Sequence, residues 1–251
     1  MRLSGNTVLI TGGATGIGYA MAEAFLSAGS AVAICGRTAR RLDEARARHP
    51  ELHTRVCDIS RQDERESLLD WASTRLPALN VLVNNAGVQR DIDFTEGIGE
   101  FLAGENEIDV NLEAPIVLTG LFVPLLAKNK GAAIVNVSSG LGFVPAAKMP
   151  VYSATKAGLH AYSMALRWQL SKLGIKVFEV VPPAVDTELN PAGRAKRGGF
   201  KAGLSAKDFV SAAMKGIEND VLEIGFGMSA GFIHASRADL DKSFEQMNSR
   251  M

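Results

Sequence analysis

The sequence predicts an α/β fold in which a doubly wound, mainly parallel seven-stranded sheet carries helices on both faces, in a single domain over residues 1–251. Short β-branched runs alternate with longer amphipathic stretches, and several runs are apolar on both faces, as in a buried parallel sheet. No stretch has the composition of an interdomain linker. The expected strands are "TVLIT" (7–11), "AVAIC" (31–35), "HTRVC" (53–57), "NVLVN" (80–84), "AIVNV" (133–137), "KVFEV" (176–180) and "VLEIG" (221–225).

The stretches between these strands have helical periodicity. In residues 17–29, apolar side chains such as Ala20 and Phe25 fall on one face, and Gly29 is placed to end the helix. Residues 154–174 repeat this pattern at greater length. Strand and helix alternating to the end of the chain are typical of the Rossmann type of sheet.

Composition limits the classes of function. With 251 residues, 47% hydrophobic residues and a formal net charge of zero, the chain is expected to be soluble and to bind no nucleic acid, which requires an excess of basic residues. No apolar run of membrane-spanning length and no signal peptide are expected. Two cysteines and four scattered histidines form no disulfide framework or ligand spacing. These features predict a cytoplasmic, metal-free protein.

A glycine-rich turn connects the first strand to the first helix in "VLITGGATGIGYAMAEAF" (8–25). Such a turn points backbone N–H groups and the positive end of a helix at an anion. A tight connection without any ligand has the same composition, but four glycines within seven residues of an N-terminal βαβ unit favour a dinucleotide pyrophosphate. The residues predicted to bind it are Gly12, Thr15, Gly16, Ile17 and Gly18.

The end of the second strand predicts which dinucleotide is bound. NAD-binding units place an acidic residue there for the ribose hydroxyls, whereas this chain has Gly36 and Arg37. A guanidinium binds a 2′-phosphate through charge-assisted hydrogen bonds, so NADP(H) is favoured over NAD(H). The alternative is that Arg37 only caps a helix or faces water.

The stretch "VYSATKAGL" (151–159) predicts an acid–base pair. Tyr152 and Lys156 are four residues apart and therefore share a helix face. A nearby ammonium group favours the phenolate, so we expect Lys156 to lower the pKa of Tyr152 and make proton transfer practicable. Taken alone, this spacing is frequent by chance.

The spacing occurs together with other motifs in a fixed order. They are TG-x3-G-x-G at 11–18, Asp58 after the third strand, NNAG at 84–87, Asn111, Ser139 thirteen residues before Tyr152, and "PPAVDT" at 182–187. With this set the chain resembles the short-chain dehydrogenase/reductase family from about residue 5 to about residue 190. The "PPAVDTEL" segment and residues 36–60 resemble the DltE-like bacterial subgroup.

The resemblance implies catalytic roles. Tyr152 would transfer the proton to the carbonyl oxygen as hydride arrives, and Ser139 would hydrogen-bond the same oxygen. Lys156 would hold the nicotinamide ribose, and Asn111 would position a water that links Lys156 to solvent. Ser138 is an alternative to Ser139, although the family spacing favours Ser139. Asn111 is alternatively a helix residue that satisfies backbone groups.

The resemblance also implies cofactor contacts. Asp58 would meet the adenine amino group, and Thr187 would meet the nicotinamide carboxamide. Further implied cofactor residues are Ile59, Asn85, Ala86, Gly87, Val185, Tyr152 and Lys156. Asn84 and Asn85 alternatively tie strands together. Where the family has Pro-Gly after the sixth strand, this chain has Pro182-Pro183, which removes a backbone donor at Pro183.

The expected activity is an NADP(H)-dependent oxidoreductase acting on a small-molecule carbonyl or alcohol. Residues 188–205, rich in glycine and basic residues, are predicted to be a substrate lid. Candidate pocket residues are Gln89, Arg90, 141–144, Leu189 and Phe200.

The family implies a homo-oligomer, a dimer or tetramer. The alternative function is a non-catalytic NADP(H)-binding sensor or scaffold; an enoyl reductase is disfavoured because such relatives place the lysine further from the tyrosine.

Overall fold

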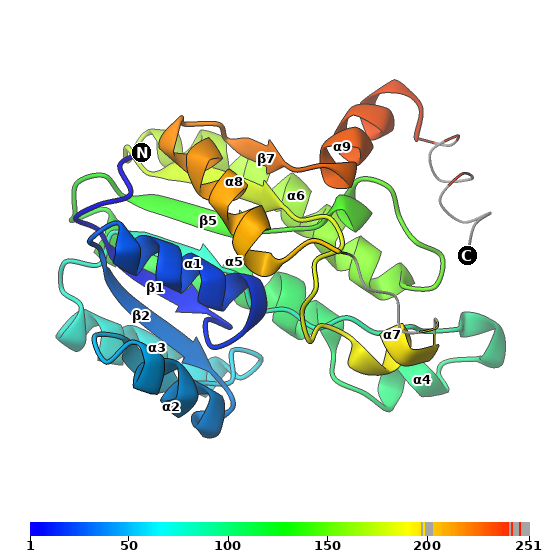
Figure 1. Ribbon diagram of the computed structural model, residues 1–251, viewed down its shortest axis with the longest axis horizontal. Coiled ribbons are helices and arrows are strands. Elements are labelled where there is room, and N and C mark those ends of the chain that lie inside the picture. Colours follow the sequence, from blue (N-terminus) through cyan, green and yellow to red (C-terminus); the bar gives the residue numbers. More distant parts are fainter. Residues whose placement is uncertain (197, 199–202, 241, 243–245, 247–251) are drawn as a thin grey trace.

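The computed structural model describes residues 1–196, 198, 203–240, 242 and 246, and within them the strands form one parallel sheet (Figure 1). Its seven strands follow the order β3-β2-β1-β4-β5-β6-β7. They are β1 (Thr7–Thr11), β2 (Ala31–Gly36), β3 (His53–Val56), β4 (Val81–Asn84), β5 (Ala133–Val137), β6 (Lys176–Val181) and β7 (Glu223–Gly225). The predicted sheet is confirmed, although β7 begins two residues later than the expected 221–225.

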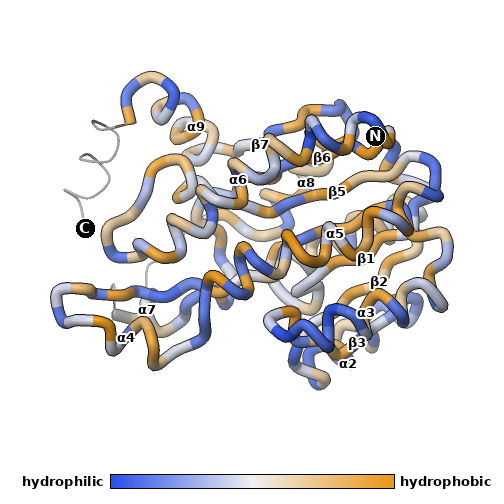
Figure 2. The backbone as a smooth tube through the Cα atoms, turned by 180° about the vertical axis from the view of Figure 1, so that it is seen from behind, coloured by the Kyte–Doolittle hydropathy of each residue, from blue (hydrophilic) through white to orange (hydrophobic). Residues whose placement is uncertain are grey.

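Helices cover both faces of the sheet. One face carries α1 (Gly16–Ser27), α2 (Ala39–Arg48) and α8 (Ala206–Glu218), as Figure 1 shows. The opposite face carries α3 (Gln62–Arg75), α5 (Ala114–Leu126) and α6 (Pro150–Ser171), as Figure 2 shows from behind. The shorter segments are η1 (Phe94–Glu96), α4 (Gly99–Leu102), the π-helical η2 (Asp109–Glu113), η3 (Gly140–Gly142), α7 (Pro191–Lys196) and α9 (Met228–Ala238).

The strands are buried from both sides. Along β1, Val8 and Ile10 pack with Phe25 of α1, whereas Leu9 faces the opposite layer, which contains Phe122 of α5. All five side chains are completely buried. This burial explains why the strands read as continuous apolar runs rather than as alternating ones.

One helical segment has the length and apolar composition needed to cross a membrane, whereas the sequence analysis expected no apolar run of that length. It spans Asp109–Leu126, that is, η2 and α5. Leu118, Phe122 and Leu126 in it are completely buried in the layer beneath the sheet. Its apolar character is that of a helix in the core of the domain.

The sheet topology places a crevice at the carboxyl end of β1. Since β2 and β4 flank β1, the connections leave β1 and β4 toward opposite sides of the sheet, and the space between them opens at this edge. The glycine turn follows β1, residues 84–87 end β4 and continue from it, and Ser139 follows β5. The fold therefore gathers three of the predicted motifs along one edge.

Candidate active site

The glycine turn leads directly into the N-terminus of α1. Thr15, the residue before the helix, makes no side-chain capping bond, and the first turn contains no acidic residue. The initial N–H groups of a helix lack partners within the helix, and here no side chain caps them. Together with the helix dipole, this arrangement suits a phosphate group.

The glycines of the turn are required by close packing. A Cβ at Gly18 would lie 2.4 Å from both Asn85 Nδ2 and the Gly12 carbonyl oxygen. Gly12 has φ of +62°, and a Cβ there would lie 2.9 Å from Ala86 Cα. Gly16 has φ of +57° and faces Thr187. The turn thus sits against NNAG and against Thr187, and this cradle of bare backbone fits a dinucleotide.

The two asparagines of NNAG tie strand ends together. Asn85 Nδ2 donates to the carbonyl oxygens of Thr11 and Gly12 at 2.9 and 3.1 Å. Asn84 Nδ2 donates to Asn136 Oδ1 on β5 at 2.9 Å. Their side chains therefore have the strand-linking role that the sequence left as an alternative, and the segment from Asn85 to Gly87 borders the crevice.

Arg37 lies at the end of β2, where the 2′-phosphate is predicted, but its guanidinium is engaged. It forms an ion pair with Glu105, and about half of its side chain is exposed. Beside it, Arg41 of α2 pairs with Glu188 at 2.6 Å. Two arginines from the β2–α2 side of the crevice thus contact carboxylates from distant segments.

The other predicted adenosine residues follow β3. Asp58 Oδ1 accepts hydrogen bonds from the backbone N and the hydroxyl of Ser60 at 3.0 and 2.7 Å, which shapes the turn before α3. Ile59 is almost completely buried. Asp58 therefore stands at the carboxyl edge of the sheet with one oxygen already used by its own turn.

The segment after β6 closes the other side of the crevice. Val185 is buried, and Thr187 Oγ1 accepts a hydrogen bond from the Leu189 backbone at 3.3 Å. In the predicted lid, Asn190 Nδ2 donates to Asp91 at 2.8 Å, just before the short α7. Within the predicted lid, residues 197 and 199–202, including the pocket candidate Phe200, lie outside the described residues.

Ser139 and Tyr152 meet at the end of β5. The Ser139 hydroxyl accepts from the Leu141 backbone N at 3.2 Å, and its interaction with the Tyr152 side chain lowers the pKa of the tyrosine. The hydroxyl of Ser138 is buried with no partner in the described part of the chain. Of the two hydroxyls that the sequence left open, that of Ser139 is therefore the one against Tyr152.

Lys156 lies beside Tyr152, yet the pKa of the tyrosine is raised rather than lowered. Burial raises the pKa of Tyr152 to about 12, the hydrogen bond from Ser139 lowers it, and the charge of Glu107 raises it. Lys156 Nζ lies 5.7 Å from the Tyr152 ring centroid and donates to the Val137 carbonyl oxygen at 2.9 Å. Burial lowers the pKa of Lys156 itself to about 8. The expected depression of the tyrosine pKa is thus outweighed by burial.

Asn111 sits within the π-helical η2, a geometry that is frequent at functional sites. Its Oδ1 accepts from the Val88 backbone N at 2.8 Å, and its Nδ2 donates to the Val88 carbonyl oxygen and to Thr155 Oγ1 at 2.8 and 3.2 Å. A Cβ on Gly87 would lie 3.2 Å from Asn111 Oδ1 and 3.6 Å from Lys156 Nζ. The asparagine side chain thus fastens η2 to the NNAG loop and α6.

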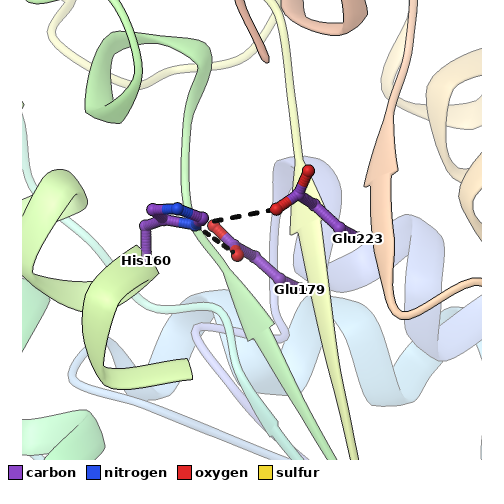
Figure 3. Close-up of side chains that lie close together, drawn as sticks. All are labelled: His160, Glu179 and Glu223. Carbon is purple, nitrogen blue, oxygen red and sulfur yellow. Dashed lines mark hydrogen bonds and ion pairs between the residues drawn. The ribbon is translucent and has the colours of Figure 1, made fainter. Parts of the chain in front are cut away.

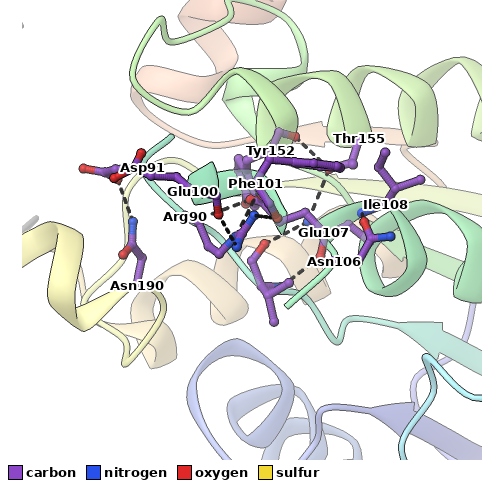
Figure 4. Close-up of polar contacts among 12 residues, drawn as sticks. Arg90, Asp91, Glu100, Phe101, Asn106, Glu107, Ile108, Tyr152, Thr155 and Asn190 are labelled. Atoms are coloured by element: carbon purple, nitrogen blue, oxygen red, sulfur yellow. Dashed lines mark hydrogen bonds and ion pairs between the residues drawn. The ribbon is translucent and has the colours of Figure 1, made fainter. Parts of the chain in front are cut away.

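Sequence reasoning missed Glu107, a carboxylate near the tyrosine (Figure 4). It lies one turn before Asn111 and is completely buried. Its Oε1 accepts from the Arg90 backbone N at 3.0 Å, while its Oε2 has no hydrogen bond among the described residues and forms a long ion pair with Arg90 Nε at 3.9 Å. Desolvation raises the pKa of Glu107, and its charge acts on Tyr152. A signal was available, because Glu107 is four residues before Asn111 and therefore on the same helix face.

Comparisons with known proteins agree with this arrangement. The profile of the short chain dehydrogenase family matches residues 6–198. An uncharacterized oxidoreductase, DltE, of Bacillus subtilis is 46% identical over 250 residues, which is 100% of this chain and 99% of the relative. A tropinone reductase homolog of Arabidopsis thaliana is 33% identical over 75% of this chain and 73% of its own length.

Solved structures share the fold over nearly the whole chain. A short chain dehydrogenase from Burkholderia cenocepacia, in complex with NADP, has a TM-score of 0.84 and 25% identity, covering 98% of this chain and 99% of its own. A short-chain dehydrogenase from Sphingobium yanoikuyae, in complex with NADPH, has a TM-score of 0.79 and 28% identity, covering 98% and 96%. With the glycine turn, NNAG and the Ser139–Tyr152 contact at one edge of the sheet, the chain belongs to the short-chain dehydrogenase/reductase family of nicotinamide-dependent oxidoreductases.

Proposed function

We propose that the protein is an NADP(H)-dependent oxidoreductase that interconverts a small carbonyl compound and its alcohol, with Tyr152 as general acid and base. The observation that carries the proposal is that Ser139, at the end of β5, acts on the side chain of the buried Tyr152, with Lys156 one helical turn further on. These groups stand at the sheet edge that also presents the phosphate-binding turn. A protein that only bound the nucleotide would have no use for two hydroxyls placed in this way.

The chain's residues would act on the proton and the developing charge, while the bound nicotinamide supplies or accepts the hydride. Tyr152 donates its phenolic proton to the carbonyl oxygen in reduction and takes it back in oxidation. Ser139 donates a hydrogen bond to the same oxygen and so stabilises negative charge there. The ammonium of Lys156 favours the phenolate that remains after transfer.

Substitution of the two hydroxyls tests this assignment. With NADPH and a panel of aldehydes, ketones and quinones, Tyr152→Phe is expected to reduce kcat at least about 100-fold, which is typical of losing a general acid. Ser139→Ala should reduce kcat substantially, whereas the matched Ser138→Ala should retain it, because the Ser138 hydroxyl has no hydrogen-bond partner among the described residues. Near wild-type turnover of Tyr152→Phe would show that another group is the acid.

The NADP(H) preference is proposed from Arg37 and from the glycine before it. A Cβ at Gly36 would meet nothing within 4 Å, so the position accepts an acidic side chain sterically. Two of the similar solved structures contain NADP and NADPH. The variant Gly36→Asp with Arg37→Ala should weaken NADPH and strengthen NADH in fluorescence titrations, since a carboxylate repels the 2′-phosphate. An unchanged preference would exclude a phosphate contact by Arg37.

We also propose a cytoplasmic homo-oligomer, and exposed apolar side chains on α5 and α6 support the oligomeric state. Trp168 is 80% exposed, Met164 is 52% exposed, and Ile116 of α5 is 40% exposed. Such a patch on a soluble domain marks a contact surface. Light scattering after size-exclusion chromatography should give a multiple of the chain mass of 26.7 kDa, and Trp168→Glu should lower it. A monomeric wild type would contradict this part of the proposal.

A further inference from the structure

A cluster of titratable side chains, His160, Glu179 and Glu223, lies between α6 and the strands β6 and β7, outside the roles assigned above (Figure 3). His160 of α6 approaches Glu179 of β6, with Nδ1 2.8 Å from Oε2. Glu223, paired across to Glu179 on β7, lies 3.9 Å from the same nitrogen. A carboxylate only accepts hydrogen bonds, so the close contact places a proton on His160 Nδ1.

Within this cluster Glu179 is the carboxylate without a full set of partners. It is completely buried, and its Oε1 has no hydrogen-bond partner among the described residues. Glu223, by contrast, is paired with Arg237 of α9, whose Nη2 lies 2.9 Å from each of its oxygens. A buried carboxylate is costly unless a positive charge lies near it.

Lys156 lies near this carboxylate, because its Nζ bonds the carbonyl oxygen of Val137, which is paired with Val180, the residue after Glu179. Lys156 and His160 are four residues apart on α6 and so occupy one face, the face that covers β6. Lys156 is 4% exposed, and its Nζ donates to a backbone carbonyl rather than to a carboxylate. The negative charge of Glu179 raises the pKa of Lys156 and opposes the lowering caused by burial.

We propose that Glu179, held in place by His160, is a positioning residue that keeps Lys156 protonated beside Tyr152. The inference rests on the proposed role of Lys156 in catalysis and assigns the buried counter-charge for it. Without the Glu179 carboxylate, the Lys156 ammonium would be a buried cation whose hydrogen bond goes to the neutral Val137 carbonyl oxygen. It would then release its proton at a lower pH.

The other charges around Glu179 do not replace it. From α6, the Arg167 guanidinium donates to the carbonyl oxygens of Val177 and Leu222. From β7 and α9, Glu223 and Arg237 neutralise each other.

The same three side chains, His160, Glu179 and Glu223, place ligand atoms within 4.8 Å of one another and form a conceivable cation site. The ion pair with Arg237 occupies both oxygens of Glu223, which leaves only two free ligands. We therefore favour the protonic role, and metal binding becomes an outcome of the test.

The test follows the protonation of Lys156 directly, by ¹³Cε NMR of the full-length protein labelled in lysine, with the resonance assigned from its absence in Lys156→Met. In the wild type the midpoint is expected near pH 8. Glu179→Gln removes the charge at nearly constant shape and should lower the midpoint by about one pH unit. Glu179→Asp, which keeps a carboxylate, should restore part of it. Glu223→Gln is the matched control and should leave it in place.

A second variant covers the case in which Glu179→Gln fails to fold. His160→Phe keeps an aromatic ring against Phe143, whose centroid lies 4.3 Å away, but removes the Nδ1 donor. A buried carboxylate that loses its donor takes up a proton more readily, so the midpoint should again fall. An unchanged midpoint in both folded variants would overturn the proposal. So would a wild-type midpoint that moves on adding EDTA or Zn²⁺, since the cluster would then be a metal site.

The NMR readout separates this inference from the proposed function. If no carbonyl compound is turned over but the midpoint falls in Glu179→Gln, the electrostatic assignment stands and the activity is wrong. With an active substrate, the alkaline limb of kcat should move to lower pH in Glu179→Gln and stay in Glu223→Gln.

Discussion

The hydroxyl of Tyr152 experiences two opposing influences from single neighbours. Ser139 lowers the pKa of the tyrosine through a hydrogen bond, and the charge of Glu107 raises it. Because burial dominates, the phenol holds its proton at neutral pH and is a weaker acid than a solvent-exposed tyrosine. Proton transfer near neutral pH therefore needs groups that stabilise the phenolate.

Neutralising Glu107 should lower the pKa of Tyr152. In Glu107→Gln a negative charge near the phenol is lost, so the phenolate becomes less unfavourable. The titration is measured as ultraviolet phenolate absorbance, with the Tyr152→Phe version of each protein subtracted. Glu96→Gln, a charge removed on the exposed η1, is the control and should titrate like the wild type. An identical midpoint in Glu107→Gln and the wild type would show that the carboxylate has no influence on the tyrosine.

At the scale of elements, the glycine turn joins three segments that are far apart in the sequence. Side chains at Gly12 and Gly18 would collide with the NNAG loop, and a Cβ at Gly16, at the start of α1, would lie 3.2 Å from Thr187 Cγ2. The cradle is therefore shaped by backbone, and only residues without Cβ atoms allow it.

Gly18→Ala should damage both this junction and nucleotide binding. Its Cβ would lie 2.4 Å from two neighbours, so the turn must shift, at a cost of about 1–3 kcal/mol in the free energy of unfolding. Urea unfolding and NADPH fluorescence titration measure the two effects, and NADPH binding should weaken more than tenfold. Gly231→Ala in α9, where a Cβ meets nothing within 4 Å, should instead stabilise by about 0.5–1 kcal/mol. Equal behaviour of the two variants would mean that the turn tolerates a side chain.

Features that depend on neighbouring residues could be predicted from the sequence, whereas side-chain contacts between distant elements could not. The Tyr152–Lys156 spacing is a local consequence of helix geometry, and the parallel sheet follows from runs apolar on both faces. The partner of Arg37 is Glu105, 68 residues away, so no local pattern indicates it. Glu179 carried a usable signal, since it is a charged residue within the buried strand "KVFEV", but the side chain that contacts it, His160, comes from α6.

At the scale of the whole molecule, the buried Lys156 is a cost in stability. Its folded pKa of about 8 lies below the ordinary value of 10.5. A lysine shifted in this direction destabilises the fold below its folded pKa, and the penalty disappears as the pH rises toward the unfolded value. The site is thus maintained at the expense of the free energy of unfolding.

Lys156→Met should therefore stabilise the protein while abolishing activity. Removal of the buried charge should add about 2–3 kcal/mol to the free energy of unfolding at pH 7. In urea unfolding the gain should shrink markedly by pH 10, where the wild-type lysine is neutral in the folded state. A gain that is the same at both pH values would indicate better packing instead of charge removal.

The π-helical η2 fixes the rotational phase of the long helix that follows it. An α-helix turns about 100° per residue, so one residue more or less within 109–113 rotates everything on one side of the segment relative to the other. Shortened by one residue, the segment would turn either the Asn111 amide away from Val88 and Thr155, or Leu118 and Phe122 out of the core. The rotation of this helix about its axis is thereby set at two separate places, by Asn111 in the crevice and by Leu118 and Phe122 beneath the sheet. An insertion or deletion between these places would break one of the two contacts, whereas a substitution leaves the rotation unchanged.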